Sequence, residues 1–196
     1  VFDCSGLKNN GEATFNAQVY SALSLLSADV INNGKKYRTL YNNHKIARED
    51  VPYYWLNIDE FQNYAKPEFA EGVVWLTSLM EEMRKNFCGI NFVMPTIKEL
   101  FPDKNSIIPT QRYQNYVMAI KKMFGLFTYR TFFRLSSDDI PTLKNAFGKA
   151  MTIDEIETVS KLHEHECLMN IEGTSNLVFN VQPTRSMLDR YDGGVG

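Results

Sequence analysis

The sequence is poor in the features that mark secreted, disulfide-stabilised or membrane-spanning proteins. Its 196 residues contain three cysteines, Cys4, Cys88 and Cys167, which are far apart and form no C-x-x-C pair. Such sparse cysteine indicates a reducing, cytosolic-facing compartment and excludes a disulfide framework. No apolar run approaches the roughly 20 residues of a transmembrane helix, and no stretch of the sequence is predicted to be a signal peptide.

An excess of positive charge is also missing. The formal net charge is −2, so no global field attracts nucleic acid. What is present, 44% hydrophobic and 13% aromatic residues, fits one globular domain with a substantial core over residues 1–196. The chain opens at Val1, inside an apolar run and without a methionine, and we expect it to be a fragment.

The central stretch of the chain is V-P-Y-Y-W-L-N-I-D-E-F, residues 51–61. The short aromatic run Tyr53–Ile58 follows Pro52 and predicts a buried strand, which breaks into Asp59 and Glu60. Ligands of open α/β sheets bind at the carboxyl ends of strands, where one carboxylate can hold magnesium and the next can polarise an attacking water. Alternatively, the two acids simply begin the next helix, where its dipole favours negative charge. The local residues leave both interpretations open.

The elements before this stretch are a strand and a helix. The segment Val1–Leu7 predicts a strand that ends in a Ser-Gly turn. Apolar residues at three- and four-residue spacing from Phe15 to Val30 predict a helix that begins after Gly11 and stops at Gly34. Residues 35–50 are expected to be a linker.

The elements after it alternate in the same way. An apolar stripe from Phe69 to Phe87 predicts an amphipathic helix that ends near Arg84 and Lys85 and is closed by Gly89. Ile90–Met94 is then expected to be a second buried strand. After a loop containing Pro102 and Pro109, another helix is predicted by a further apolar set: Tyr113, Tyr116, Val117, Ile120 and Met123.

The last third has a different character. Leu126–Leu135 is β-rich but carries two arginines, so we expect an edge strand or a strand near the site, and not a strand at the centre of the sheet. Ser136 to Asp139 predict the cap of a helix, and Thr152 with Glu155 predicts a capping box for the next. Residues 167–171 and 177–181 flank Gly-Thr-Ser-Asn and predict a β-hairpin. This helical pair and hairpin, residues 136–190, is expected to pack on the rest.

In this order, the chain resembles the type IV secretion and conjugative-transfer ATPases, RecA-like hexameric motors related to the HerA and FtsK translocases. The matching segments are V-F-D-C-S-G-L, Y-W-L-N-I-D-E-F as a Walker B motif, M-R-K-N-F-C-G-I-N-F, L-M-N-I-E-G and L-V-F-N-V. The resemblance covers roughly residues 1–189 and corresponds to the C-terminal half of the family's motor domain. It implies an α/β fold: a partial RecA-like P-loop NTPase sheet with flanking helices, followed by the helical pair and hairpin.

The resemblance also implies roles for individual residues. Asp59 would support magnesium through water, Glu60 would activate the attacking water, and both would take part in nucleotide binding. Arg84 would stabilise the transferring phosphate, including from a neighbouring subunit; its alternative is a solvated cation at a helix end. ATP and magnesium would be cofactors only together with the missing half. The implied partners are further copies in a hexamer and the secretion or conjugation machinery, in the cytoplasm or at the inner face of the cell membrane.

Two departures from the family pattern matter. No G-x-x-x-x-G-K-[ST] loop occurs, and the nearest segments, Gly148-Lys149-Ala150 and Gly34-Lys35-Lys36, lack its Ser or Thr. We therefore expect this chain alone to be inactive, with the phosphate-binding loop encoded upstream of Val1. Where the family often has a Thr-Gln sensor, this sequence has Pro95, whose side chain cannot hydrogen-bond a phosphate.

Other constellations are weaker. His163, His165 and Cys167 would align on a strand, but no second ligand cluster completes a metal site. Residues 136–182 imitate a winged helix-turn-helix, yet hold three lysines, no arginine and eight acids, which counts against DNA binding. Residues 66–134 hold ten basic residues and six acids, so contact with DNA or another polyanion is expected there.

The predicted function is thus a motor ATPase fragment that couples ATP hydrolysis to pilus assembly or to DNA or protein transfer. One alternative is an FtsK-type DNA translocase or coupling protein, which would need basic loops facing DNA. Another is a non-catalytic α/β protein-interaction module, which the absent phosphate-binding loop and Pro95 favour.

Overall fold

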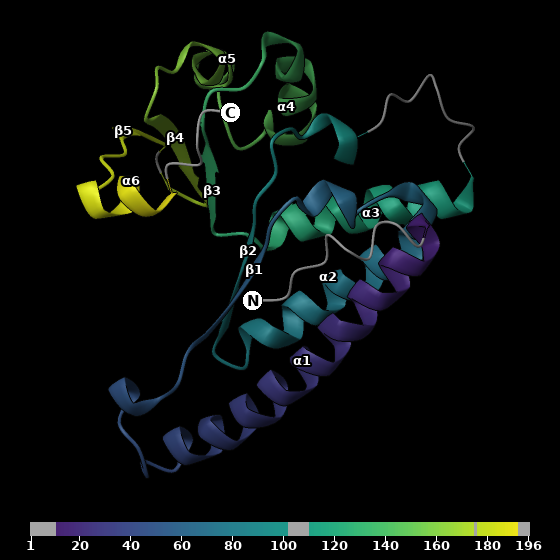
Figure 1. Ribbon diagram of the computed structural model, residues 1–196, viewed down its shortest axis with the longest axis vertical. Helices are drawn as coiled ribbons and strands as arrows, with labels where there is room; N and C mark the ends of the chain where they lie inside the picture. Colours follow the sequence, from purple (N-terminus) through teal and green to yellow (C-terminus); the bar gives the residue numbers. More distant parts are fainter. Residues whose placement is uncertain (1–10, 102–109, 175, 192–196) are drawn as a thin grey trace. The chain divides into compact units, whose positions relative to one another are not determined.

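The structure is a computed structural model, which describes residues 11–101, 110–174 and 176–191. These residues form two compact units, the first ending at Leu126 and the second beginning at Phe127. Each unit is described on its own (Figure 1), and a single domain over residues 1–196 stays a prediction. The strand predicted at Val1–Leu7 lies outside the described residues.

The described residues of unit 1 form a pair of parallel strands, three α-helices and four short 3-10 helices (η). Its elements are α1 (Glu12–Asn42), η2 (Arg48–Asp50), β1 (Tyr54–Ile58), η3 (Phe61–Asn63), η4 (Pro67–Phe69), α2 (Ala70–Arg84), β2 (Cys88–Phe92), η5 (Lys98–Leu100) and α3 (Gln111–Leu126). β1 and β2 pair in parallel, with Trp55 opposite Gly89. The strand–helix–strand order predicted around Asp59 and Glu60 is therefore confirmed.

The helix between the strands is held by its apolar stripe. Val73, Leu76 and Met83 are at most 2% exposed, and α2 packs extensively on α3 and more narrowly on α1 (Figure 1). The prediction that Gly89 closes this helix is wrong, because α2 ends at Arg84 and Gly89 lies within β2. A side chain at that position would meet the ring of Trp55, so the glycine is needed for strand packing and not for a cap.

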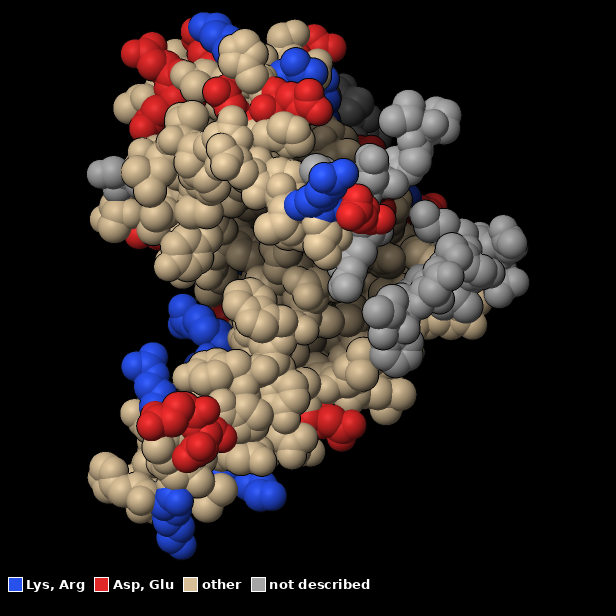
Figure 2. Space-filling model, turned by 60° about the vertical axis from the view of Figure 1, so that its left-hand side comes forward, with Lys and Arg blue, Asp and Glu red and all other residues tan. Residues whose placement is uncertain are grey.

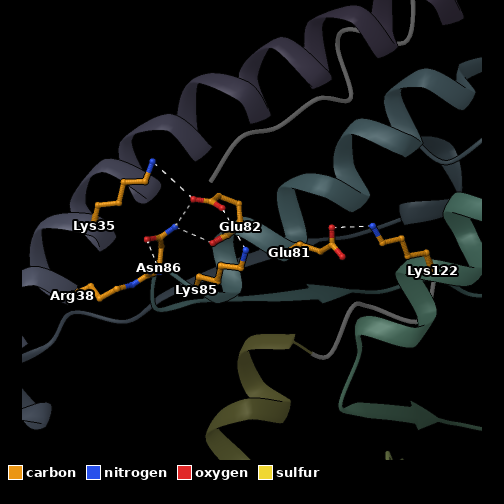
Figure 3. A network of polar contacts seen from close by, with 7 residues as sticks. All are labelled: Lys35, Arg38, Glu81, Glu82, Lys85, Asn86 and Lys122. Carbon is orange, nitrogen blue, oxygen red and sulfur yellow. Dashed lines mark hydrogen bonds and ion pairs between the residues drawn. The ribbon is translucent and has the colours of Figure 1, made fainter. Parts of the chain in front are cut away.

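The predicted end of the first helix is also wrong. α1 continues through Gly34 to Asn42, so the first part of the expected linker is helical. A Cβ atom on Gly34 would lie 2.4 Å from the Asn86 Cβ and 2.5 Å from its carbonyl oxygen. Arg38 then donates a hydrogen bond to the Asn86 Oδ1 atom at 3.0 Å (Figure 3). Glycine at this position therefore permits close helix packing and does not end the helix.

The strands are less covered than predicted. On one face, Ile58 and Cys88 are buried toward the helices. On the other face, the side chains of Trp55 and Asn57 are exposed, as is Asn91 of β2. The expectation of two fully buried strands is thus wrong within the described residues, because the helices of unit 1 cover one face.

Unit 2 is an antiparallel sheet with short helices. Its elements are β3 (Tyr129–Phe132), η6 (Ser137–Asp139), α4 (Ile140–Phe147), α5 (Ile153–Lys161), β4 (Glu166–Ile171), β5 (Leu177–Asn180) and α6 (Arg185–Tyr191). The strand order is β3-β4-β5, so the predicted hairpin and the predicted edge strand are both confirmed. The Thr152–Glu155 capping box is also present. Arg130 of β3 points inward, 2.7 Å from Glu172 and 5.6 Å from the Phe147 ring centre.

The helices of the described segments are too short or too polar to span a lipid bilayer.

Candidate functional site

The acidic pair follows the last residue of β1, at the carboxyl end of the parallel strands. Both side chains are exposed. One oxygen of Asp59 accepts the backbone N–H of Glu60 at 2.9 Å. Glu60 has φ 52° and ψ 43°, the left-handed region that non-glycine residues rarely adopt. Such conformations cluster at functional sites, since a strained backbone persists only where its surroundings hold it.

The Glu60 carboxylate is held by a buried amide. The Gln62 Nε2 atom donates a hydrogen bond to the Glu60 Oε2 atom at 2.5 Å, and Gln62 is only 4% exposed. Its own Oε1 atom is buried and has no hydrogen-bond partner among the described residues. Buried polar groups normally form hydrogen bonds, so an unpaired Gln62 oxygen costs free energy. The hydrogen bond from the Gln62 Nε2 atom fixes the direction of the Glu60 side chain.

The turn that carries the acids is tied to the end of β2. The Val93 N–H donates to the Ile58 carbonyl, and the Phe61 N–H donates to the Val93 carbonyl, each at 3.0 Å. The rings of Phe61 and Phe92 are stacked with centres 3.9 Å apart. The acids therefore stand on a fixed turn where the two parallel strands end.

Arg84 lies at the other end of the strands. It is the last residue of α2 and lines a cavity with the first residues of β1 and β2, Tyr54 and Cys88. Five strand residues at roughly 3.3 Å each separate this end from the acids by about 15 Å. The structure brings Asp59 and Glu60 together but does not bring Arg84 to them within one chain.

The chemistry available at the acidic end is that of exposed carboxylates. Carboxylate oxygens suit magnesium, which keeps several of its waters, and Asp59 fits such a role because its side chain is accessible. No group of three or more His, Cys, Asp or Glu suited to a metal occurs in the part of the chain that the structure describes. His163, His165 and Cys167 thus gain no further ligand there.

Two site features could not be read from the sequence. Gln62 gave no signal, because its link to Glu60 depends on the left-handed backbone of the turn. The cavity around Arg84 was missed because Arg48 belongs to a segment predicted to be a linker, and Trp55 to a strand predicted to be buried.

Comparison with known sequences gives a distant relative. No protein-family model matches the chain. An uncharacterized protein of Bacillus anthracis, pXO2-09, is 28% identical over 195 residues. The match covers 98% of this chain but 29% of that protein, so the chain spans less than a third of its relative.

Comparison with solved structures shows the fold. VirB4 of Thermoanaerobacter pseudethanolicus is similar with a TM-score of 0.68 at 15% identity, over 96% of this chain and 42% of that one. The genome packaging NTPase B204 of Sulfolobus turreted icosahedral virus 2 gives a TM-score of 0.43 at 11% identity, over 76% of this chain and 62% of that one, which is too low to show a shared fold. The chain is therefore a mixed α/β protein whose fold is similar to part of VirB4, as the resemblance to secretion ATPases predicted.

Proposed function

We propose that this chain is part of a RecA-like motor ATPase of type IV secretion or conjugative transfer, which couples ATP hydrolysis to pilus assembly or to substrate transfer. The observation that supports it most directly is the acidic turn at the carboxyl end of a parallel strand, with Glu60 oriented by Gln62. The similarity of fold to VirB4 agrees with this proposal. In the complete protein, a phosphate-binding loop outside this sequence would hold the nucleotide beside the turn.

The two acids would have different roles. Bound Mg-ATP supplies the phosphoryl group and the charge that the site must neutralise. Asp59 would hold magnesium through water, with its exposed carboxylate oriented by a hydrogen bond from the Glu60 N–H. Glu60 would orient the attacking water and accept its proton, with its own position fixed by the Gln62 amide.

Arg84 would act only between copies. Because it lies at the opposite end of the strands from Glu60, it cannot reach a nucleotide at the acidic turn of its own chain. In a closed ring, each copy offers one face to the opposite face of the next. We propose that Arg84 faces the nucleotide of a neighbouring copy in such a ring, a hexamer, at the cytoplasmic side of the membrane.

Replacing Glu60 in the full-length protein tests the proposal. Glu60→Gln keeps the shape of the side chain and removes its charge. A general base contributes about a hundredfold or more to the rate, so we expect ATP hydrolysis to fall by about that factor while ATP affinity stays nearly unchanged. Asp59→Asn should instead weaken the magnesium-dependent part of binding.

A matched control is Glu68→Gln, which removes another exposed carboxylate, from η4. It should leave hydrolysis unchanged. If full-length Glu60→Gln hydrolyses ATP as fast as the unmodified protein, the two acids are only the start of the following helical turns. The non-catalytic interaction module would then be the better interpretation.

A further inference from the structure

Arg84 ends a helix that carries two acids within one turn before it. The sequence of α2 closes with Met-Glu-Glu-Met-Arg, so Glu81 and Glu82 precede Arg84 by three and two positions. Side chains three apart on a helix are neighbours and can form an ion pair, whereas side chains two apart do not face each other. Glu81 is therefore the carboxylate of α2 that is placed to neutralise Arg84 within its own chain.

The structure shows Glu81 paired with a different cation. The Lys122 Nζ atom of α3 donates a hydrogen bond to the Glu81 Oε2 atom at 2.9 Å (Figure 3). α3 packs extensively on α2, and the buried Thr77 hydroxyl of α2 lies 3.4 Å from the Ala119 carbonyl oxygen, three residues before Lys122. The packing of the two helices therefore holds the lysine beside Glu81.

Glu82 is held by a separate set of groups. Lys35 of α1 and Lys85 lie 3.9 and 4.0 Å from its carboxylate oxygens, and the Asn86 Nδ2 atom lies 3.4 Å from one of them. The same Asn86 atom donates to the Glu82 backbone carbonyl at 2.9 Å, which fixes the last turn of α2. Figure 3 shows Glu81 directed toward α3 and Glu82 toward α1. Both acids near the end of α2 are thus already engaged by lysines.

Arg84 is left exposed in positive surroundings. It has no ion pair with any other residue that the structure describes. It lines the same cavity as Arg48, and residues 35–50 hold five lysines and arginines against two acids. Figure 2 shows basic side chains around the lower end of the molecule, with acidic ones among them. An arginine without a counter-charge in such surroundings suits a negatively charged partner from outside the chain.

We propose that Lys122 keeps Arg84 available for the nucleotide of a neighbouring copy by engaging Glu81. Without the lysine, the Glu81 carboxylate turns along the helix to Arg84 and neutralises it. An exposed pair of this kind shifts an equilibrium by up to about fivefold. Lys122 acts through Glu81 and is therefore a positioning residue. The nucleotide as partner rests on the proposed function, whereas the competition of Lys122 and Arg84 for Glu81 does not.

The competition is measured on this chain alone with phenylglyoxal, which modifies exposed guanidinium groups and reacts more slowly with those held by a carboxylate. Mass spectrometry follows the rate at Arg84, with the exposed Arg134 of unit 2 as the internal reference. Lys122→Met keeps the apolar stem of the side chain and removes its charge, so the rate at Arg84 should fall about two- to fivefold. Adding Glu81→Gln should restore the rate.

The consequence for the reaction is measured in the full-length protein. Lys122→Met should lower kcat for ATP hydrolysis about two- to fivefold with KM unchanged, and the loss should shrink at high salt, because salt screens exposed charges. Glu81→Gln alone should have little effect, and its combination with Lys122→Met should restore kcat. If the ion pair were purely structural, both single variants and the double variant would be equally impaired.

Arg112→Met is the matched control, because the pair of Arg112 and Glu71 joins the same two helices, also at 2.9 Å, near the start of α2. It should leave both ATP hydrolysis and the modification rate at Arg84 unchanged. Far-ultraviolet circular dichroism shows whether each variant is folded.

Two results would overturn the inference: an unchanged modification rate at Arg84 in the Lys122→Met variant, or a loss that Glu81→Gln does not restore. A different result would overturn the role of Arg84 in the proposed function. In that case, full-length Arg84→Ala hydrolyses ATP as fast as the unmodified protein, while the modification rates at Arg84 still depend on Lys122 and Glu81.

Discussion

A methyl group at Gly34 is expected to loosen the contact between α1 and the turn before β2. Glycine inside a helix normally costs about 1 kcal/mol relative to alanine, so Gly34→Ala would stabilise the protein if nothing stood nearby. Instead the new Cβ would meet the Cβ, Cα and carbonyl oxygen of Asn86 at 2.4 to 2.8 Å. Since two of these atoms are backbone, no side-chain rotation relieves the overlap, and α1 must move away.

The size of the effect follows from these two opposing terms. Overpacking of a well-packed site costs typically 1–3 kcal/mol. Asn86 is fully buried, and the hydrogen bonds of its side-chain amide with the Glu82 carbonyl and with Arg38 are also disturbed when α1 moves. We place the overpacking cost in the upper half of that range, and after the gain in helix propensity we expect a net loss of about 1–2 kcal/mol in the free energy of unfolding.

Gly125→Ala is the matched control, because at that helical glycine of α3 no atom of the described residues beyond its own helical turn lies within 4 Å of the new methyl group. It should raise the free energy of unfolding by up to about 1 kcal/mol. Urea denaturation followed by far-ultraviolet circular dichroism measures both changes. If Gly34→Ala stabilises the protein as Gly125→Ala does, the close approach of α1 to Asn86 is refuted.

Two further changes probe the core and the acidic turn. The hydroxyl of the fully buried Tyr116 shares its one proton between the carbonyl oxygens of Ala65 and Leu100, 3.0 and 2.9 Å away, so Tyr116→Phe should cost about 1–3 kcal/mol. Burial raises the pKa of Tyr116 in the folded state. The stability that comes from this shift is therefore complete below the unfolded pKa of about 10 and is lost as the pH rises above that value. Tyr116→Phe should reduce this alkaline loss of stability in denaturation curves measured at several pH values. Gln62→Met removes the donor to Glu60 and should lower kcat for ATP hydrolysis by the full-length protein about ten- to a hundredfold without changing KM, since a hydrogen bond to a charged group is worth about 1.5–3 kcal/mol. An unchanged kcat would show that this bond does not orient the carboxylate in the reaction.

The sequence predicted best what depends on neighbours in the chain. The stripe of α2, the order of strand, helix and strand in unit 1 and the hairpin of unit 2 all follow from local periodicity and turn residues. The two predictions based on glycines were wrong, because Gly34 and Gly89 do not end helices. A side chain at these positions would overlap with Asn86 and Trp55, respectively. Those contacts join distant parts of the chain, and no local pattern encodes them.

The same distinction between local and distant contacts applies to the residues of the candidate site. The adjacency of Asp59 and Glu60 at a strand end could be predicted, since it is a matter of chain order. The separation of Arg84 from them also follows from chain order, because a helix that connects two parallel strands ends at the amino end of the second strand. The hydrogen bond from Gln62 to Glu60 could not be predicted, because it depends on the left-handed backbone angles of Glu60 in the turn.

α1 contacts the chain near both ends of the strand pair. Near its start, Glu12 forms an ion pair with Lys66, and the Tyr20 hydroxyl donates to the Tyr64 carbonyl at 2.9 Å, just after the acidic turn. Farther along, Gly34 is clamped against Asn86, beside the cavity that holds Arg84. At about 1.5 Å per residue, roughly 33 Å of helix separates Glu12 from Gly34, so a tilt of about 5° at the clamp moves the start of the helix by about 3 Å. A displacement of that size exceeds the reach of a hydrogen bond, so the loop after the acidic turn cannot keep its contacts with α1 while the helix pivots at the other end.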